Sequence, residues 1–112
     1  MDGKDLILSF AVLDPGDPTE IESLILLRTP VYESLLDAAE RGVTVSFERY
    51  QSDDDDFLEE AYWNAETATI RLKTQMRTYE LDLRKVDRRS LSAMRKVLKK
   101  MNFDRRIRLS GI

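Results

Sequence analysis

The amino-acid sequence predicts a single α+β domain over residues 1–112, built from a mainly antiparallel sheet of five to seven strands and two helices. A length of 112 residues is that of one ordinary domain. Hydrophobic residues make up 42% of the chain and charged residues 35%, a composition typical of folded proteins. Apolar residues recur with a period of two in some segments and of about 3.6 in others, which indicates strands and helices in one chain.

The first predicted element is a strand over residues 4–13. Its apolar residues occupy both parities, which is typical of a central strand that is covered on both faces. Residues 14–18 read Asp-Pro-Gly-Asp-Pro, the strongest turn signal in the chain. Because this connection is short, a second strand over residues 21–28 is expected to run antiparallel to the first.

A helix is predicted next, from Pro30 to about Arg41. Thr29 can cap its first turn, and proline suits the first helical position because the missing N–H would have had no partner there. Gly42 can end the helix in the left-handed conformation. Residues 43–50 then alternate apolar and polar side chains, so a half-buried strand is expected to follow.

The middle of the chain is predicted to be a solvated acidic loop over residues 51–56 and a short strand over residues 57–63. On either side, residues 4–50 and 68–109 both follow the order strand, strand, helix, strand. This order indicates a ββαβ pseudo-repeat, although the two halves share almost no side-chain identity.

A β-hairpin is predicted from the alternation of apolar residues over 68–73 and 79–83. A register in which paired residue numbers add to 151 sets Leu72 opposite Tyr79 and leaves Gln75–Met76 in the turn. Sums of 149 or 153 are alternatives, whereas a slip by one would turn every apolar side chain toward water. Gln-Met is a poor two-residue turn sequence, so a longer loop is a further alternative.

The last predicted helix runs from about Arg88 to Met101, with Asp87 as its cap and Asn102 as its terminator. Its apolar residues form one stripe at helical spacing. Residues 105–109 alternate basic and apolar side chains, which predicts a final strand.

Charge is strongly segregated along the chain. Residues 1–83 contain 7 Lys and Arg against 19 Asp and Glu, a net charge of −12, whereas residues 84–112 contain 11 against 2, a net charge of +9. The candidate binding residues are the basic side chains that lie off the apolar stripe of the last helix or follow it in the tail: Arg88, Arg89, Arg95, Lys96, Lys99, Lys100, Arg105, Arg106 and Arg108.

This segregation predicts a non-catalytic interaction module, such as a small accessory, adaptor or immunity-like protein, that docks an acidic protein partner through its basic helix and tail. Nucleic acid is the alternative ligand for the same surface. Nucleic acid ranks second to a protein partner for two reasons. The chain has a net charge of −3, and it lacks an RRM-type, KH-type or helix-turn-helix pattern. Self-association is a related prediction, and internal pairing with the chain's own carboxylates is the structural alternative.

An enzyme, a cofactor and a metal site are not expected. The chain has no cysteine or histidine, and its four glycines form no phosphate-binding loop. The acidic run Asp53–Asp56 lacks the spacing of an EF-hand. No membrane span or secretory signal is predicted, so a cytoplasmic location is expected. Tyr62 and Trp63, the one adjacent aromatic pair, are a candidate interface anchor or, alternatively, part of the core and its rim.

Overall fold

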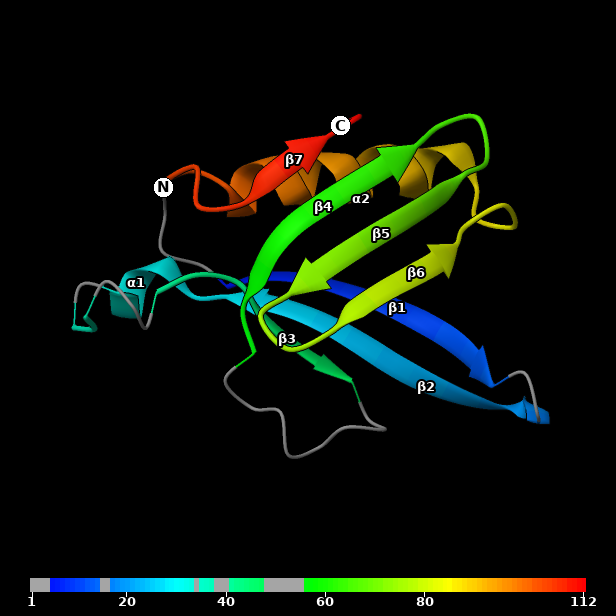
Figure 1. Ribbon diagram of the computed structural model, residues 1–112, viewed down its shortest axis with the longest axis horizontal. Coiled ribbons are helices and arrows are strands. Elements are labelled where there is room, and N and C mark those ends of the chain that lie inside the picture. The colour runs from blue at the N-terminus through cyan, green and yellow to red at the C-terminus, as the bar shows by residue number, and fades with distance from the viewer. Residues whose placement is uncertain (1–4, 15–16, 34, 38–40, 48–55) are drawn as a thin grey trace.

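The computed structural model describes residues 5–14, 17–33, 35–37, 41–47 and 56–112 (Figure 1). In chain order the elements are β1 (Leu6–Asp14), β2 (Asp17–Arg28), α1 (Pro30–Glu33), β3 (Thr44–Phe47), β4 (Leu58–Asn64), β5 (Thr69–Thr74), β6 (Thr78–Asp82), α2 (Arg88–Met101) and β7 (Arg108–Ser110). The α+β class is confirmed. The strands form two sheets where one was predicted: sheet A in the order β1-β2-β3 and sheet B in the order β6-β5-β4-β7.

Strands β1 and β2 form the antiparallel pair that the short connection predicts, with Leu8 opposite Leu26. The prediction that the first strand is central was wrong, because β2 lies in the middle of sheet A and β1 lies at its edge. One face of β1 turns Phe10 into the core, whereas Ile7 on the other face is 55% exposed. The alternate apolar residues of β1 therefore point to two different environments, one face packing in the core and the other facing outward.

The first predicted helix is a single turn, α1, and the predicted extension to Arg41 is not observed in the described residues. Among the described residues there is thus one long helix, α2, where two were predicted. Leu35, just after this turn, is 82% exposed and so does not pack against the core. A short helix without such packing is only marginally stable in water.

The β5–β6 hairpin has the predicted register, with Leu72 opposite Tyr79. Its turn depends on Asp56, which was predicted to lie in a solvated loop but is fully buried. The Asp56 carboxylate accepts hydrogen bonds from the Thr74 hydroxyl at 2.6 Å and from the Met76 backbone N–H at 3.0 Å. A distant residue thereby holds a turn whose own sequence is unfavourable, and the rest of the acidic run lies outside the described residues.

Helix α2 has the predicted bounds and the predicted caps. The Asp87 carboxylate accepts hydrogen bonds from the backbone N–H of Ser90 at 3.1 Å and from its hydroxyl at 2.6 Å. Asn102 follows as the C-cap. The final strand, β7, is shorter than predicted and pairs in parallel with β4. Gly111, just beyond it, has a φ of +75°, and a Cβ there would collide with the carbonyl group of Trp63.

The predicted ββαβ order recurs, as β1-β2-α1-β3 and as β5-β6-α2-β7. The strand pairing does not recur, because β3 pairs with β2 whereas β7 pairs with β4. The pseudo-repeat is therefore a similarity of element order without a repeated topology.

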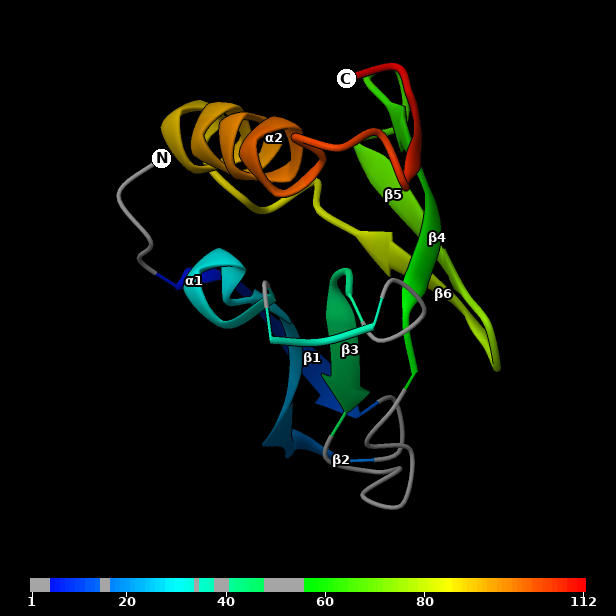
Figure 2. The same cartoon turned by 90° about the vertical axis from the view of Figure 1, so that its left-hand side faces the viewer.

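The core lies where the inner faces of both sheets meet the apolar stripe of α2. Figure 2 shows α2 beside sheet B and above sheet A. Met94, Leu98 and Met101 of α2 belong to one buried cluster with Leu26 of sheet A and Leu72 of sheet B. This packing fixes the rotation of α2 about its own axis and so decides which of its residues face outward.

Candidate docking surface

Helix α2 carries six basic side chains on the side opposite its buried stripe. At 100° per residue these side chains form two rows with the same spacing, Arg88–Arg95–Lys99 and Arg89–Lys96–Lys100. Arg95 is half-buried and the other five are exposed. None of the six forms an ion pair with any residue that the structure describes. We call these six residues the basic face of α2, which extends over about 18 Å at about 1.5 Å per residue.

The three predicted tail residues lie apart from this face. Arg106 pairs with Asp104 at 2.6 Å, and Arg108 pairs with Glu60 of β4 at 3.2 Å. Arg105 is exposed, has a φ of +59° and makes no ion pair within the described part of the chain. The structure therefore does not bring all nine predicted cations together, because two of the three in the tail already have carboxylate partners.

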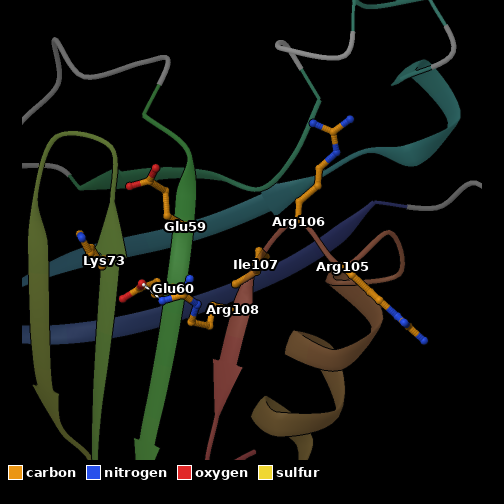
Figure 3. A pocket seen from close by; sticks show the side chains of 7 residues that line it. All are labelled: Glu59, Glu60, Lys73, Arg105, Arg106, Ile107 and Arg108. Carbon is orange, nitrogen blue, oxygen red and sulfur yellow. Dashed lines mark hydrogen bonds and ion pairs between the residues drawn. The ribbon is translucent and has the colours of Figure 1, made fainter.

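The tail lines an open depression of about 560 Å³ beside β4 (Figure 3). Its lining residues are Glu59, Glu60, Lys73, Arg105, Arg106, Ile107 and Arg108. Glu60, Lys73 and Arg108 lie together over sheet B, whereas Arg105 and Arg106 point away from them. Because both acidic and basic side chains line the depression, it does not favour a ligand of one particular charge.

Sequence reasoning missed a buried cation, Arg28, at the end of β2. Its side chain is fully buried and donates to both carboxylate oxygens of Glu33, at 2.7 and 2.8 Å. It also donates to both carboxylate oxygens of Asp104, at 2.9 and 2.7 Å, and to the Met101 carbonyl oxygen at 2.7 Å. The Phe103 ring stacks 4.0 Å from the guanidinium. Nothing in the sequence around Arg28 indicates that this residue is buried between two carboxylates, because both its place at the end of a predicted strand and its charge are typical of an exposed residue.

These contacts change the acidity of the groups that take part. Hydrogen bonds from Arg28, and then from Arg106, lower the pKa of Asp104 to about 2. Burial by itself lowers the pKa of Arg28, but its hydrogen bonds with Asp104 and Glu33 outweigh burial and raise that pKa. Arg28 therefore stays charged and joins β2, α1 and the segment after α2.

The aromatic pair divides between the core and the surface, because the two side chains lie on opposite faces of β4. Trp63 is 4% exposed and belongs to the core, so it is not accessible to a partner. Tyr62 is 46% exposed on the outer face of sheet B. Phe103, which sequence reasoning did not single out, is a second exposed aromatic residue and lies just beyond α2.

Among the described residues, no cluster of carboxylates is arranged to hold a metal ion. The buried carboxylate of Asp56 is occupied by the hydrogen bonds of the β5–β6 turn. The other three residues of the acidic run, Asp53–Asp55, lie outside the described residues.

Comparison with known protein families, curated proteins and solved structures finds no match to this chain. Within the described ranges, no helix combines the length and the apolar character that crossing a membrane requires.

Proposed function

We propose that the protein is a non-catalytic interaction module whose basic face of α2 docks onto an acidic surface of a protein partner. One observation carries this proposal: six cations share an accessible helix face without a carboxylate partner among the described residues. An external anionic surface can neutralise such a face and steer its encounter with the partner.

The cost of this arrangement to the helix supports an external role. Arg95 and Lys99 are four residues apart, as are Lys96 and Lys100, and like charges at this spacing destabilise a helix. Arg88 and Arg89 stand in the first turn, where the helix dipole disfavours positive charge. Because these residues do not stabilise α2 through ion pairs in the described structure, their charge is available for binding.

A protein partner fits the molecule better than a long nucleic acid. The chain carries a net charge of −3, so a polyanion that extends beyond α2 would be repelled by the rest of the molecule. The carboxylates of Glu59 and Glu60 line the depression beside the basic tail. A compact acidic surface about as long as α2 would contact the basic face without meeting those carboxylates.

The test compares two variants that lose the same charge at different places. The first variant replaces with Gln the row of the basic face whose three residues are all exposed, namely Arg89, Lys96 and Lys100. The control replaces Arg71, Lys73 and Arg84, which are exposed on or beside sheet B, with Gln. Each purified chain is immobilised and used to capture proteins from nuclease-treated extract of the cells that produce it.

We expect the wild type and the control to recover the same protein, and the α2 variant to recover it about tenfold less, a loss of about 1.4 kcal/mol. Equal recovery by all three chains would refute the proposed surface. A titration with mixed-sequence oligonucleotides tests the alternative. Binding that weakens steeply between about 50 and 200 mM salt, and that only the α2 variant loses, would assign the basic face to nucleic acid.

A further inference from the structure

Helix α2 contains two serines whose hydroxyl groups have different surroundings. The Ser90 hydroxyl belongs to the cap of the helix and donates a hydrogen bond to the Asp87 carboxylate at 2.6 Å. Ser92 is half-buried, and its hydroxyl makes no hydrogen bond with the residues that the structure describes. Serine inside a helix contributes less to helix stability than alanine does. The stability of α2 therefore does not account for a serine at this position.

The neighbours of Ser92 on the helix surface are all basic. On a helix, a side chain lies beside the residues three and four positions before and after it. For Ser92 these residues are Arg88, Arg89, Arg95 and Lys96, so four members of the basic face surround one hydroxyl. At 100° per residue, Ser92 lies between the two rows of this face. The same four positions around Ser90 hold no cation.

This arrangement suits a phosphate group that is attached to the Ser92 hydroxyl. Such a group carries a charge of about −1.5 to −2 at pH 7 and has three acceptor oxygens. Guanidinium groups bind phosphate through paired hydrogen bonds, which favours arginine as its neighbour. Because no described carboxylate pairs with the four surrounding cations, the phosphate would take up charge that the fold leaves unneutralised.

We propose that Ser92 is a phosphorylation site and that its phosphate switches off the basic face of α2. This regulation rests on the docking function proposed above, because the phosphate occupies cations that would otherwise bind the acidic partner. The Ser92 Oγ attacks the terminal phosphorus of a nucleoside triphosphate that a protein kinase holds. The bond from that phosphorus to the departing nucleoside diphosphate breaks, and the hydroxyl proton passes to a base of the kinase.

The beginning of α2 gives a kinase access to Ser92. Residues 84–90 are all exposed, and the first buried residue of the helix is Met94. Arg88 and Arg89 oppose the helix dipole in the first turn, which lowers the cost of opening that turn. A kinase can therefore bind the chain on the N-terminal side of Ser92, while the buried residues nearer the end of α2 hold the rest of the helix in place.

The first test measures phosphorylation, with the two serines as matched sites. Purified wild type, Ser92→Ala and Ser90→Ala are incubated with extract of the cells that produce the chain and with ATP labelled in its terminal phosphate. Circular dichroism establishes that all three chains are folded. We expect the wild type and Ser90→Ala to be labelled and Ser92→Ala to remain unlabelled. A wild type without label, or equal label in Ser92→Ala, overturns the proposal.

The second test measures what the phosphate does to the basic face. At low salt, phosphate on Ser92 should raise Tm by about 4 °C, and high salt should remove most of this gain because it screens the ion pairs. A fluorescent peptide of about six glutamates extends over about 20 Å, which is close to the length of the basic face. We expect the phosphorylated chain to bind this peptide about tenfold more weakly than the unphosphorylated chain. A lower Tm, or equal binding by both forms, overturns the switch.

The two proposals fail in different measurements. If the unphosphorylated wild type does not bind the glutamate peptide, the docking function is refuted, whereas label on Ser92 and a higher Tm would still identify the modification site. If the peptide binds but Ser92 is not labelled, the phosphorylation site is refuted and the docking function stands.

Discussion

Arg28 and the basic face of α2 show two opposite uses of positive charge in one chain. Arg28 is buried, and its guanidinium donates to two carboxylates and a backbone carbonyl. The cations of α2 are accessible and have no carboxylate partner in the described residues. The difference teaches that residue type alone does not separate a structural cation from a binding one. What separates them is whether the fold supplies the counter-charge.

The largest expected effect is the loss of the structural cation. Replacing Arg28 with Met leaves the buried Glu33 carboxylate without its partner, so we expect the free energy of unfolding to fall by about 3–5 kcal/mol. Urea denaturation followed by circular dichroism measures this change. Arg71→Met is the matched control, because its ion pair with Glu80 is exposed and 4.0 Å long, and it should cost less than about 0.5 kcal/mol. A comparable loss in both variants would erase the proposed difference between buried and exposed cations.

A buried anion extends the comparison to negative charge. Asp56→Ala removes the acceptor for the Thr74 hydroxyl and the Met76 N–H, and we expect a loss of about 2–3 kcal/mol in the same assay. Asp82→Ala, which removes an exposed carboxylate at the end of β6, serves as the control and should change stability little. If Asp56→Ala unfolds at the urea concentration of the wild type, the turn does not depend on this carboxylate.

The pH dependence of stability separates the partners of Arg28 further. The pKa of Asp104 is about 2 in the folded chain against an ordinary 3.8, so the folded state favours its charged form. The resulting stabilisation is complete above about pH 4 and is lost as the pH falls toward 2. After allowance for partial exposure it amounts to about 1–2 kcal/mol.

Urea denaturation at intervals between pH 5 and pH 2 should therefore show a smaller acid-dependent loss of stability in Asp104→Asn than in the wild type. An identical slope in both chains would contradict the role of Asp104 as an ionised partner of Arg28.

The smallest expected effect on stability belongs to the basic face of α2. Replacing Arg89 and Lys96 with Gln removes like-charge repulsion but no ion pair within the described structure, so the free energy of unfolding should change by less than about 0.5 kcal/mol. Thermal unfolding at low and high salt measures this change, and salt should stabilise the wild type more than the variant because it screens the repulsion. A large loss of stability would show that these cations serve the fold.

Local sequence patterns predicted some elements well. The bounds and caps of α2 follow from Asp87, an apolar stripe at helical spacing and Asn102, all within one segment. The β5–β6 register follows from the alternation of neighbouring residues. The basic residues of α2 were identified because cations opposite an apolar stripe must face away from whatever that stripe contacts. Their accessibility is a structural finding, whereas their role in binding stays a prediction.

Long-range contacts account for what was not predicted. The burial of Asp56 depends on a turn about twenty residues away, and the parallel pairing of β7 with β4 joins residues about fifty apart. The tail residues Arg106 and Arg108 looked like binding cations because their partners, Asp104 and Glu60, are identified only by the folded chain. The sequence pattern also did not indicate that the strands divide into two sheets.

The sequence by itself determined the segregation of charge, the hairpin register and the capped, two-sided helix α2, because each depends on the spacing of residues within a short segment. Only the tertiary structure decided which charges are neutralised inside the protein, that α1 ends after one turn and that the strands divide into two sheets. Those features depend on which distant segments are in contact, and the local periodicity of the sequence carries no information about contacts between distant segments.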